Sequence, residues 1–128
     1  MKRQNISTGA PWEDIVGYSR AVKMGNVIEV SGTVSIRDGE VVGKEDAYVQ
    51  TVRILEIIKE TLEKAGASLE NVIRTRMLVT NIHRDWQAIG KAHGEVFKNI
   101  KPATTMVEVN KLIDSDYLLE IEATAIFE

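Results

Sequence analysis

The sequence predicts a two-layer α/β sandwich in which helices cover one face of a sheet. Strand-like segments lie towards both ends of the chain, and two segments with helical periodicity lie between them, separated by a further strand. The predicted order is therefore strands, helix, strand, helix and two strands. Helices long enough to cover a sheet then pack together on the same side of it.

The first predicted element is a hairpin within residues 18–36. β-branched residues dominate 27–31, the segment Met24–Asn26 supplies a turn, and residues 18–23 are the expected partner strand. Residues 33–36 form another short extended piece. Asp38-Gly39 marks the turn that follows it.

Residues 46–65 show the clearest helical pattern. Asp46 is a suitable N-cap, and Gly66 stands where a glycine commonly ends a helix. Apolar residues at three- and four-residue steps define the face expected to be buried: Tyr48, Val52, Leu55, Ile58, Leu62 and Ala65.

The second half predicts a strand at 73–80, a helix from its cap Asp85 to about Lys98, and strands at 104–109 and 118–127. The first of these strands places Ile73 on the same face as Met77. Gly90 and Gly94 lie inside the helix, where each costs about 1 kcal/mol, so we expect another element to approach closely there.

The sheet face without helices carries apolar and small residues, among them Val30, Val107 and Val109. Such a face is unfavourable in water. We therefore expect it to be buried by self-association into a closed, symmetric oligomer.

Composition limits the classes of function. The 128 residues fit one domain, 1–128, and the net charge of −3 argues against a nucleic-acid binder. The chain has no cysteine, which excludes thiolate chemistry and disulfides. Neither a signal peptide nor an apolar run of membrane-spanning length is apparent, so we expect a cytoplasmic protein without membrane contact.

Familiar catalytic and metal motifs are incomplete. His93-Gly94-Glu95 matches half of the zinc deaminase signature, but the cysteine half is missing. His83 and His93 have no standard ligand spacing. We therefore expect no metal site, whereas a nucleophile–His–Asp triad assembled in space stays open.

Polar residues on apolar strands are the remaining candidates for chemistry. Glu108, Glu120 and Glu122 lie within predicted strands, and Thr104 and Thr105 begin one. A strand glutamate is usually solvated on the outer face. A glutamate in an oligomer cleft would differ, because partial burial raises its pKa towards that of a general acid or base.

Two motifs give the chain a resemblance. Residues 101–109 read KPATTMVEV and residues 119–125 read LEIEATA. They resemble the Pro-Ala-Arg-Ser-x-Val-Glu-Val signature and the closing strand of the RidA/YjgF family of imine and enamine deaminases. The segments 18–32, 65–69 and 73–81 also fit that family in order.

The resemblance implies a chorismate-mutase-like fold, with a mixed sheet and two helices on one face. It also implies a homotrimer with a barrel-like core and ligand clefts between subunits. Active members hydrolyse 2-imino acids to 2-keto acids and ammonia without a cofactor. An arginine grips the substrate carboxylate, a closing-strand glutamate positions water, and a tyrosine and a serine line the site.

Carried over to this sequence, Glu120 is the implied catalytic residue, and Tyr18 and Ser31 match the lining residues. Thr104 stands where the arginine belongs, and Thr105 follows it. A guanidinium clamps a carboxylate through two charged hydrogen bonds, whereas a threonine offers one neutral bond. Its loss lowers the rate on the order of 100- to 10,000-fold unless Arg20, Arg74 or Arg76 replaces it.

Three functions follow from these features. The first is a deaminase-type hydrolase, such as a 2-iminobutanoate or 2-iminopropanoate deaminase, with a substrate choice altered by Thr104. The second is a non-catalytic trimer that binds a small ligand or acts in regulation. The third, a ribonuclease or translation inhibitor, is disfavoured by the acidic charge and the lack of a basic, aromatic strip.

Overall fold

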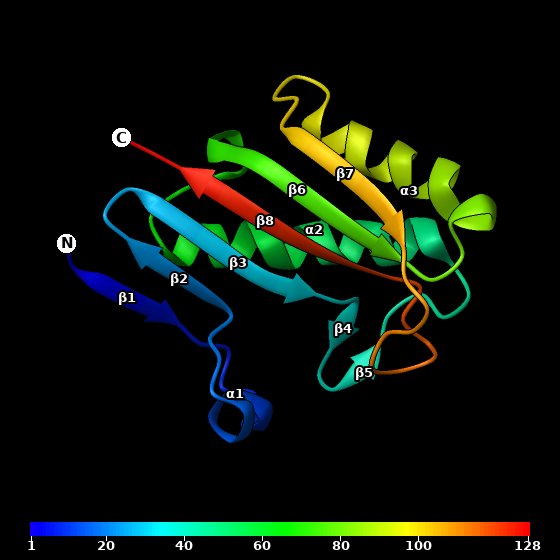
Figure 1. Cartoon of the computed structure of the whole chain (residues 1–128), viewed down its shortest axis with the longest axis horizontal. Coiled ribbons are helices and arrows are strands. Elements are labelled where there is room, and N and C mark those ends of the chain that lie inside the picture. The colour runs from blue at the N-terminus through cyan, green and yellow to red at the C-terminus, as the bar shows by residue number, and fades with distance from the viewer.

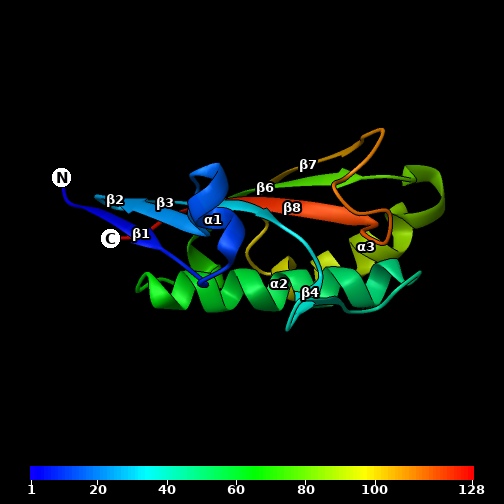
Figure 2. The same cartoon turned by 90° about the horizontal axis from the view of Figure 1, so that it is seen from below.

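The computed structural model describes all 128 residues as a sheet with two long helices packed on one face (Figures 1 and 2). The helices are α1 (Pro11–Val16), α2 (Ala47–Lys64) and α3 (Ile82–Phe97), with a 3₁₀ turn η1 (Leu69–Asn71). The main strands are β1 (Arg3–Ile6), β2 (Ala21–Met24), β3 (Val27–Thr33), β6 (Val72–Val79), β7 (Ala103–Glu108) and β8 (Leu119–Ile126). A separate ribbon comprises β4 (Ile36–Arg37) and β5 (Glu40–Val41).

The six main strands lie in the order β1-β2-β3-β8-β6-β7. Every pair is antiparallel except β6 and β7, which are parallel. The connection between β6 and β7 runs through α3, as parallel strands require. The predicted sandwich with a mixed sheet is therefore confirmed, and β8 lies in the interior of the sheet, between β3 and β6.

The helix α2 forms where the sequence predicts it, but its buried face is rotated. The Asp46 side chain accepts a hydrogen bond from the Val49 N–H at 3.0 Å, as an N-cap should. Val52 is 37% exposed, whereas Thr51 is buried. The Thr51 hydroxyl can be buried because it donates to the carbonyl of Ala47 at 2.7 Å. Tyr48 was also expected to be buried but is only partly covered.

The helix α3 begins earlier than predicted. Asn81 is its N-cap and accepts from the Arg84 N–H at 3.2 Å. Asp85, expected as the cap, is instead a buried first-turn residue paired with the Arg84 guanidinium at 2.9 Å. An acidic side chain is favourable at either position, because both lie at the positive end of the helix dipole.

The expected close approach to the α3 glycines is wrong within the chain. A Cβ built on Gly90 or Gly94 would meet no atom within 4 Å. Trp86, on the same helix, is 50% exposed. This surface of α3 is therefore open in the single chain.

The core lies between the sheet and α2 and α3. The alternation predicted for β8 is confirmed, since Leu119, Ile121, Ala123 and Ala125 are all buried. On β6, Ile73 is 48% exposed, because a register shift between Val72 and Arg74 turns it away from the core. The Asp38-Gly39 turn is confirmed, with both residues at positive φ.

The N-terminal segment contains two elements that the sequence pattern did not predict. The strand β1 pairs with β2, and the short helix α1 lies beyond the end of these strands, away from α2 (Figures 1 and 2). Trp12, Ile15 and Val16 of α1 are 63–72% exposed. A six-residue helix shows too little periodicity to be recognised from its sequence.

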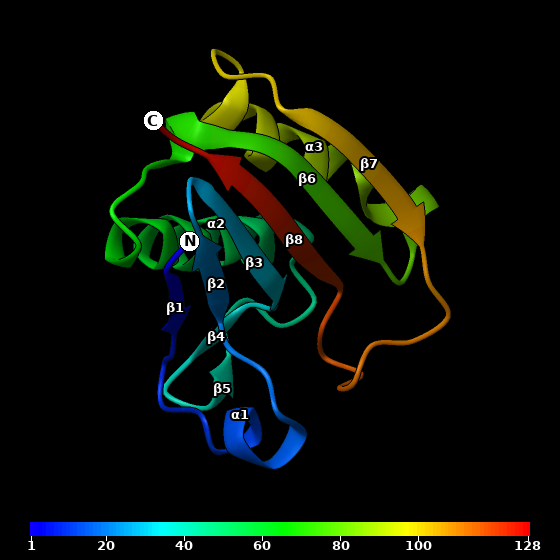
Figure 3. The ribbon, with the colours of Figure 1, turned by 60° about the vertical axis from the view of Figure 1, so that its left-hand side comes forward.

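The face of the sheet opposite the helices is uncovered in the single chain (Figure 3). Apolar residues lie on it among charged ones, and Val107 and Ile126 are 43% and 39% exposed. Its burial by other copies stays a prediction. No helix combines the length and the apolar composition needed to cross a bilayer.

Candidate functional site

The carboxylate of Glu120 lies on the uncovered face of the sheet. Glu120 pairs with Leu78 across β8 and β6, and its neighbours in sequence, Leu119 and Ile121, face the core. Its side chain is half-buried and makes no hydrogen bond or ion pair within the chain. Burial raises the pKa of Glu120, the nearby Glu122 raises it further, and Arg20 lowers it.

The backbone of β3 shapes the place where Glu120 lies. A Cβ at Gly32 would come 2.7 Å from Cδ of Glu120, and closer still to its Oε1. The pairing of β3 and β8 shifts register between Val30 and Thr33, so Gly32 lies in an irregular part of the strand. The carboxylate therefore rests directly on a backbone that only glycine leaves open.

The guanidinium of Arg20 is the positive charge of this region. Its Nη2 donates to the carbonyl oxygen of Gly32 at 2.5 Å, and its Nε is buried without a partner. Nη1 also has no partner, and it is not among the buried atoms, so it reaches the surface. Burial lowers the pKa of Arg20, while nearby Tyr18, Glu13 and Glu120 raise it. An arginine with free donors beside an unpaired carboxylate can bind a polar ligand.

Ser31 and Tyr18 belong to the same region of the chain. The Ser31 hydroxyl donates to the carbonyl of Ser19 at 2.6 Å, and the Ser31 N–H donates to the carbonyl of Arg20 at 3.0 Å. The Ser31 side chain thus fastens β3 to the segment that carries Arg20. Tyr18 is 37% exposed, and its N–H donates to the carbonyl of Glu13 at 3.0 Å.

Glu13 is a buried carboxylate that the sequence analysis missed. Burial raises its pKa, but hydrogen bonds from Ser7, Thr8 and Ala10 outweigh this effect and hold the pKa below its ordinary value. It accepts the Thr8 hydroxyl at 2.7 Å and the Thr8 N–H at 3.1 Å. The signal was a glutamate in the first turn after Pro11, where helix N-termini favour an acid. Glu13 therefore ties the start of α1 to the loop before it, and its charge acts on Arg20.

Thr104 and Thr105 lie on the edge strand β7, two strands away from β8. The Thr104 hydroxyl is 2.8 Å from that of Thr75, a buried residue of the helix-covered face. Thr105 lies on the uncovered face and accepts from Arg74 Nη2 at 2.7 Å. Within one chain, Thr104 and Glu120 therefore lie on opposite faces of the sheet.

The three arginines considered from the sequence have different surroundings. Arg74 is bonded to Thr105, and Arg76 is exposed opposite Glu122. Of these three arginines, only Arg20 lies close enough to Glu120 to affect the pKa of its carboxyl group. Sequence reasoning named Arg20 but had no means of choosing it, because its position depends on pairing between β2 and β3 and between β3 and β8.

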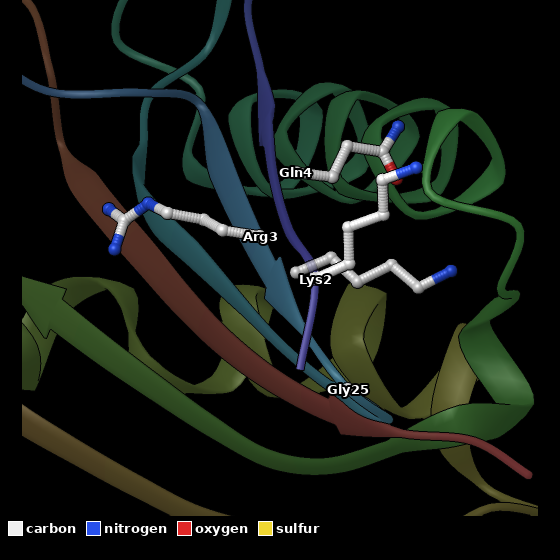
Figure 4. Close-up of a pocket in the computed structure, with 5 residues that line it drawn as sticks. Lys2, Arg3, Gln4 and Gly25 are labelled. Atoms are coloured by element: carbon white, nitrogen blue, oxygen red, sulfur yellow. The ribbon is translucent and has the colours of Figure 1, made fainter.

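Two hollows on the surface of the chain lie elsewhere. One is at the free edge of the sheet, where Lys2 and Gln4 point to one side of β1 and Arg3 to the other (Figure 4). Lys23 and Gly25 complete its lining. Gly25 lies at the opposite end of β3 from Gly32, so this hollow is separate from Glu120. The other lies near Asn81 and Asp116. No cluster of three metal-ligating His, Asp or Glu side chains is present.

The comparisons with known proteins agree with the fold. The profile of the Ribonuc_L-PSP family, described as Endoribonuclease L-PSP, matches residues 8–127. A RutC family protein from Pyrococcus abyssi is 39% identical over 127 residues, covering 98% of each chain. The 3-aminoacrylate deaminase RutC of Acinetobacter baylyi is 36% identical over 112 residues, covering 84% of this chain and 85% of that one.

A solved structure is also similar. Rv2704 from Mycobacterium tuberculosis, a member of the YjgF/YER057c/UK114 family, has a TM-score of 0.89 and 42% identity, covering 98% of this chain and all of that one. The mixed sheet with helices on one face thus defines a chorismate-mutase-like α+β protein. The Glu120 carboxylate lies on the uncovered face of that sheet. The chain belongs to the RidA/YjgF family.

Proposed function

We propose that the protein hydrolyses the C=N bond of a small imine, or of its enamine tautomer, with Glu120 as the catalytic residue. The observation that carries this proposal is the half-buried Glu120 carboxylate, which has no partner within the chain and a raised pKa. A raised pKa suits a group that takes and returns a proton near neutral pH. The related RutC is a 3-aminoacrylate deaminase, which acts on an enamine.

The reaction needs only water and the protein. The Glu120 carboxylate takes a proton from water while the water oxygen bonds to the carbon of the protonated imine, which gives a neutral carbinolamine. Glu120 then returns this proton to the amino nitrogen, and the C–N bond breaks. The carbon keeps the oxygen as a carbonyl and the hydroxyl proton leaves with the ammonia, so a protonated imine and water give a ketone and ammonium.

The positive charge near the reacting group comes from Arg20 in this proposal. Its free Nη1 is available to a substrate carboxylate, and its bond to the Gly32 carbonyl fixes the guanidinium in place. Arg20 thereby supplies the charge that Thr104 lacks. Tyr18 and Ser31 shape the same region through the segment they brace.

The ligand cleft in this proposal lies between subunits of a homotrimer. Neither the hollow at Lys2 and Gly25 nor the hollow at Asn81 and Asp116 is lined by Glu120. Thr104 and Thr105 lie on an edge strand, and the adjoining surface of α3 at Gly90 and Gly94 is open. In this proposal a neighbouring copy packs on this edge with its Glu120 facing Thr104, so that a complete site needs two chains.

A non-catalytic ligand-binding or regulatory trimer is the second candidate. The neutral Thr104 favours it, because a threonine cannot clamp a carboxylate as an arginine does. The acidic net charge of −3 continues to argue against a ribonuclease.

The test is hydrolysis of 2-iminobutanoate and 2-iminopropanoate, generated by an amino-acid oxidase and trapped with semicarbazide. Wild type, Glu120→Gln, Arg20→Met and Thr104→Arg are compared, with the exposed Gln4→Met, on the opposite edge strand β1, as the matched control. We expect loss on the order of 100-fold or more in Glu120→Gln and Arg20→Met. If wild type shows no hydrolysis and the Thr104→Arg variant does, the proposal of a hydrolase is rejected and the ligand-binding trimer is supported.

A further inference from the structure

A line of hydrogen bonds joins the edge strand β7 to the helix α3. The Thr104 hydroxyl donates to the carbonyl of Pro102 at 3.0 Å and lies 2.8 Å from the Thr75 hydroxyl. The Thr75 hydroxyl lies 2.9 Å from Nε2 of His93. Thr75 is fully buried, so its hydroxyl has no access to water and must be satisfied by these two neighbours.

The number of protons available to these three hydrogen bonds gives them a single donor-to-acceptor direction. A hydroxyl has one proton and a carbonyl has none, so the bond to Pro102 takes the proton of Thr104. The bond between the two threonines must then use the Thr75 proton. The remaining bond needs a proton on His93, and therefore Nε2 of His93 is the protonated ring nitrogen. All three bonds exist together only in this arrangement.

The direction of these hydrogen bonds decides which ligand groups the Thr104 hydroxyl can bind. Thr104 is exposed, its proton points to Pro102, and one of its lone pairs is used by Thr75. It therefore shows a second lone pair to a ligand and is an acceptor. A carboxylate ligand could bond to it only if the proton left Pro102, which gives up one hydrogen bond for another.

We propose that Thr104 is a specificity-determining acceptor for an N–H group of the ligand, oriented by His93 through Thr75. This inference rests on the proposed function and deepens it. The nitrogen end of an imine or enamine, rather than its carboxylate, binds at Thr104. His93 is a positioning residue, since it touches Thr75 and not the ligand. Burial also lowers the pKa of His93, which keeps the ring neutral and its unbonded Nδ1 an acceptor at neutral pH.

The first test compares two probes that share a carboxylate and differ at the neighbouring carbon. L-2-aminobutanoate carries N–H donors, and 2-oxobutanoate carries none. Dissociation constants are measured by NMR titration for wild type, Thr104→Val and the conservative Thr104→Ser. We expect wild type and Thr104→Ser to prefer the amino compound, and Thr104→Val to lose threefold to tenfold of that preference, the effect of one hydrogen bond.

Comparison between variants removes the contribution of Glu120, which is the same in all three proteins. An unchanged preference in Thr104→Val, or binding of neither probe to wild type, would overturn the proposal. The hydrolysis assay is run on the same samples. If the preference depends on Thr104 while hydrolysis is absent, the proposed hydrolase fails and the acceptor site stands.

The second test determines which atom donates in the hydrogen bond between His93 and Thr75. Two-bond ¹H–¹⁵N correlation spectra distinguish the two tautomers of a neutral histidine ring. We expect His93 to be the Nε2–H tautomer in wild type and to lose this fixed state in Thr75→Val, with exposed His83 as the internal reference. An Nδ1–H tautomer of His93 in wild type would overturn the assigned direction, whatever the stability of the variant.

Discussion

The side chain of Glu120 lies directly against the backbone of Gly32, in the space that a Cβ at residue 32 would fill. The same glycine offers its carbonyl oxygen to Arg20. One residue without a side chain thus separates and positions the two charged groups of the candidate site. Its substitution should disturb the site without removing either group.

We predict that Gly32→Ala lowers kcat/KM for imine hydrolysis on the order of 10- to 100-fold, because the added methyl group displaces the Glu120 carboxylate. Gly32 has no positive φ, so the variant keeps its backbone conformation. Steady-state kinetics and the midpoint of thermal unfolding are measured together. Full activity in a folded Gly32→Ala protein would show that the position of Glu120 is unimportant.

A second prediction concerns the pH profile of hydrolysis. Glu120 acts as a carboxylate base, so activity rises as pH passes its pKa. Glu122 raises that pKa, and therefore Glu122→Gln should shift the acid limb of the kcat/KM profile to lower pH. A limb that stays in place, or moves to higher pH, would mean that another group controls it. Glu29→Gln, a change at an exposed strand glutamate, is the control.

The raised pKa also has a consequence for stability. The folded chain holds the Glu120 proton more tightly than the unfolded chain, so this group makes the fold less stable as pH rises from the unfolded to the folded pKa. We expect Glu120→Gln to be more stable than wild type at pH 7, and this difference to shrink at pH 4. Urea unfolding at both pH values measures it, and equal differences would contradict the assignment.

The buried Gln50 should be essential for stability. Its Nε2 donates to the carbonyls of Gly43 and Asp116 at 3.1 and 2.9 Å, and its Oε1 accepts from the Leu118 N–H at 3.0 Å. Gln50→Met leaves these buried groups unpaired. We predict a loss of about 2–4 kcal/mol in the free energy of unfolding.

The matched control for Gln50→Met is Gln87→Met, at an exposed position on α3. This change should alter the free energy of unfolding by less than about 0.5 kcal/mol. Equal effects of the two substitutions in urea unfolding would show that the three bonds of Gln50 contribute little.

The open surface of α3 gives a stabilising prediction. Gly94→Ala adds a methyl group where no atom lies within 4 Å, in a helix interior that favours alanine by about 1 kcal/mol. We expect a higher free energy of unfolding in the dissociated chain. If the trimer packs on this surface, the same change weakens assembly, which sedimentation at several concentrations would detect.

The sequence was sufficient for the two long helices, for the main strands from β2 onwards and for their order, but not for β1 and α1. The alternation in β8 and the caps of α2 follow from local chemistry, and both are present. The prediction that Ile73 lies on the same face as Met77 was wrong, because a register shift is set by the partner strand rather than by the strand itself. The predicted start of α3 at Asp85 was wrong, because Asn81 and Asp85 are both residue types that commonly cap a helix.

The candidate site was predictable in part. Glu120 and Thr104 followed from the resemblance, and the structure adds the surroundings of each. The roles of Arg20, Glu13 and Thr75 depend on contacts between strands and a helix that no local pattern encodes. Their sequence neighbourhoods are ordinary, so only the folded chain reveals what they touch.

The central position of β8 has a consequence for how the protein folds during its synthesis. The ribosome delivers β3 and β6 long before the strand that must insert between them. Until then the hairpin bearing Arg20 and the unit bearing Thr75, His93 and Thr104 have no sheet in common. The second unit is contiguous in sequence and can close early, whereas the surroundings of Glu120 can form only after β8 has been synthesised. The order of the strands therefore allows the hydrogen-bonded group at Thr104 to form in a nascent chain before the surroundings of Glu120 do.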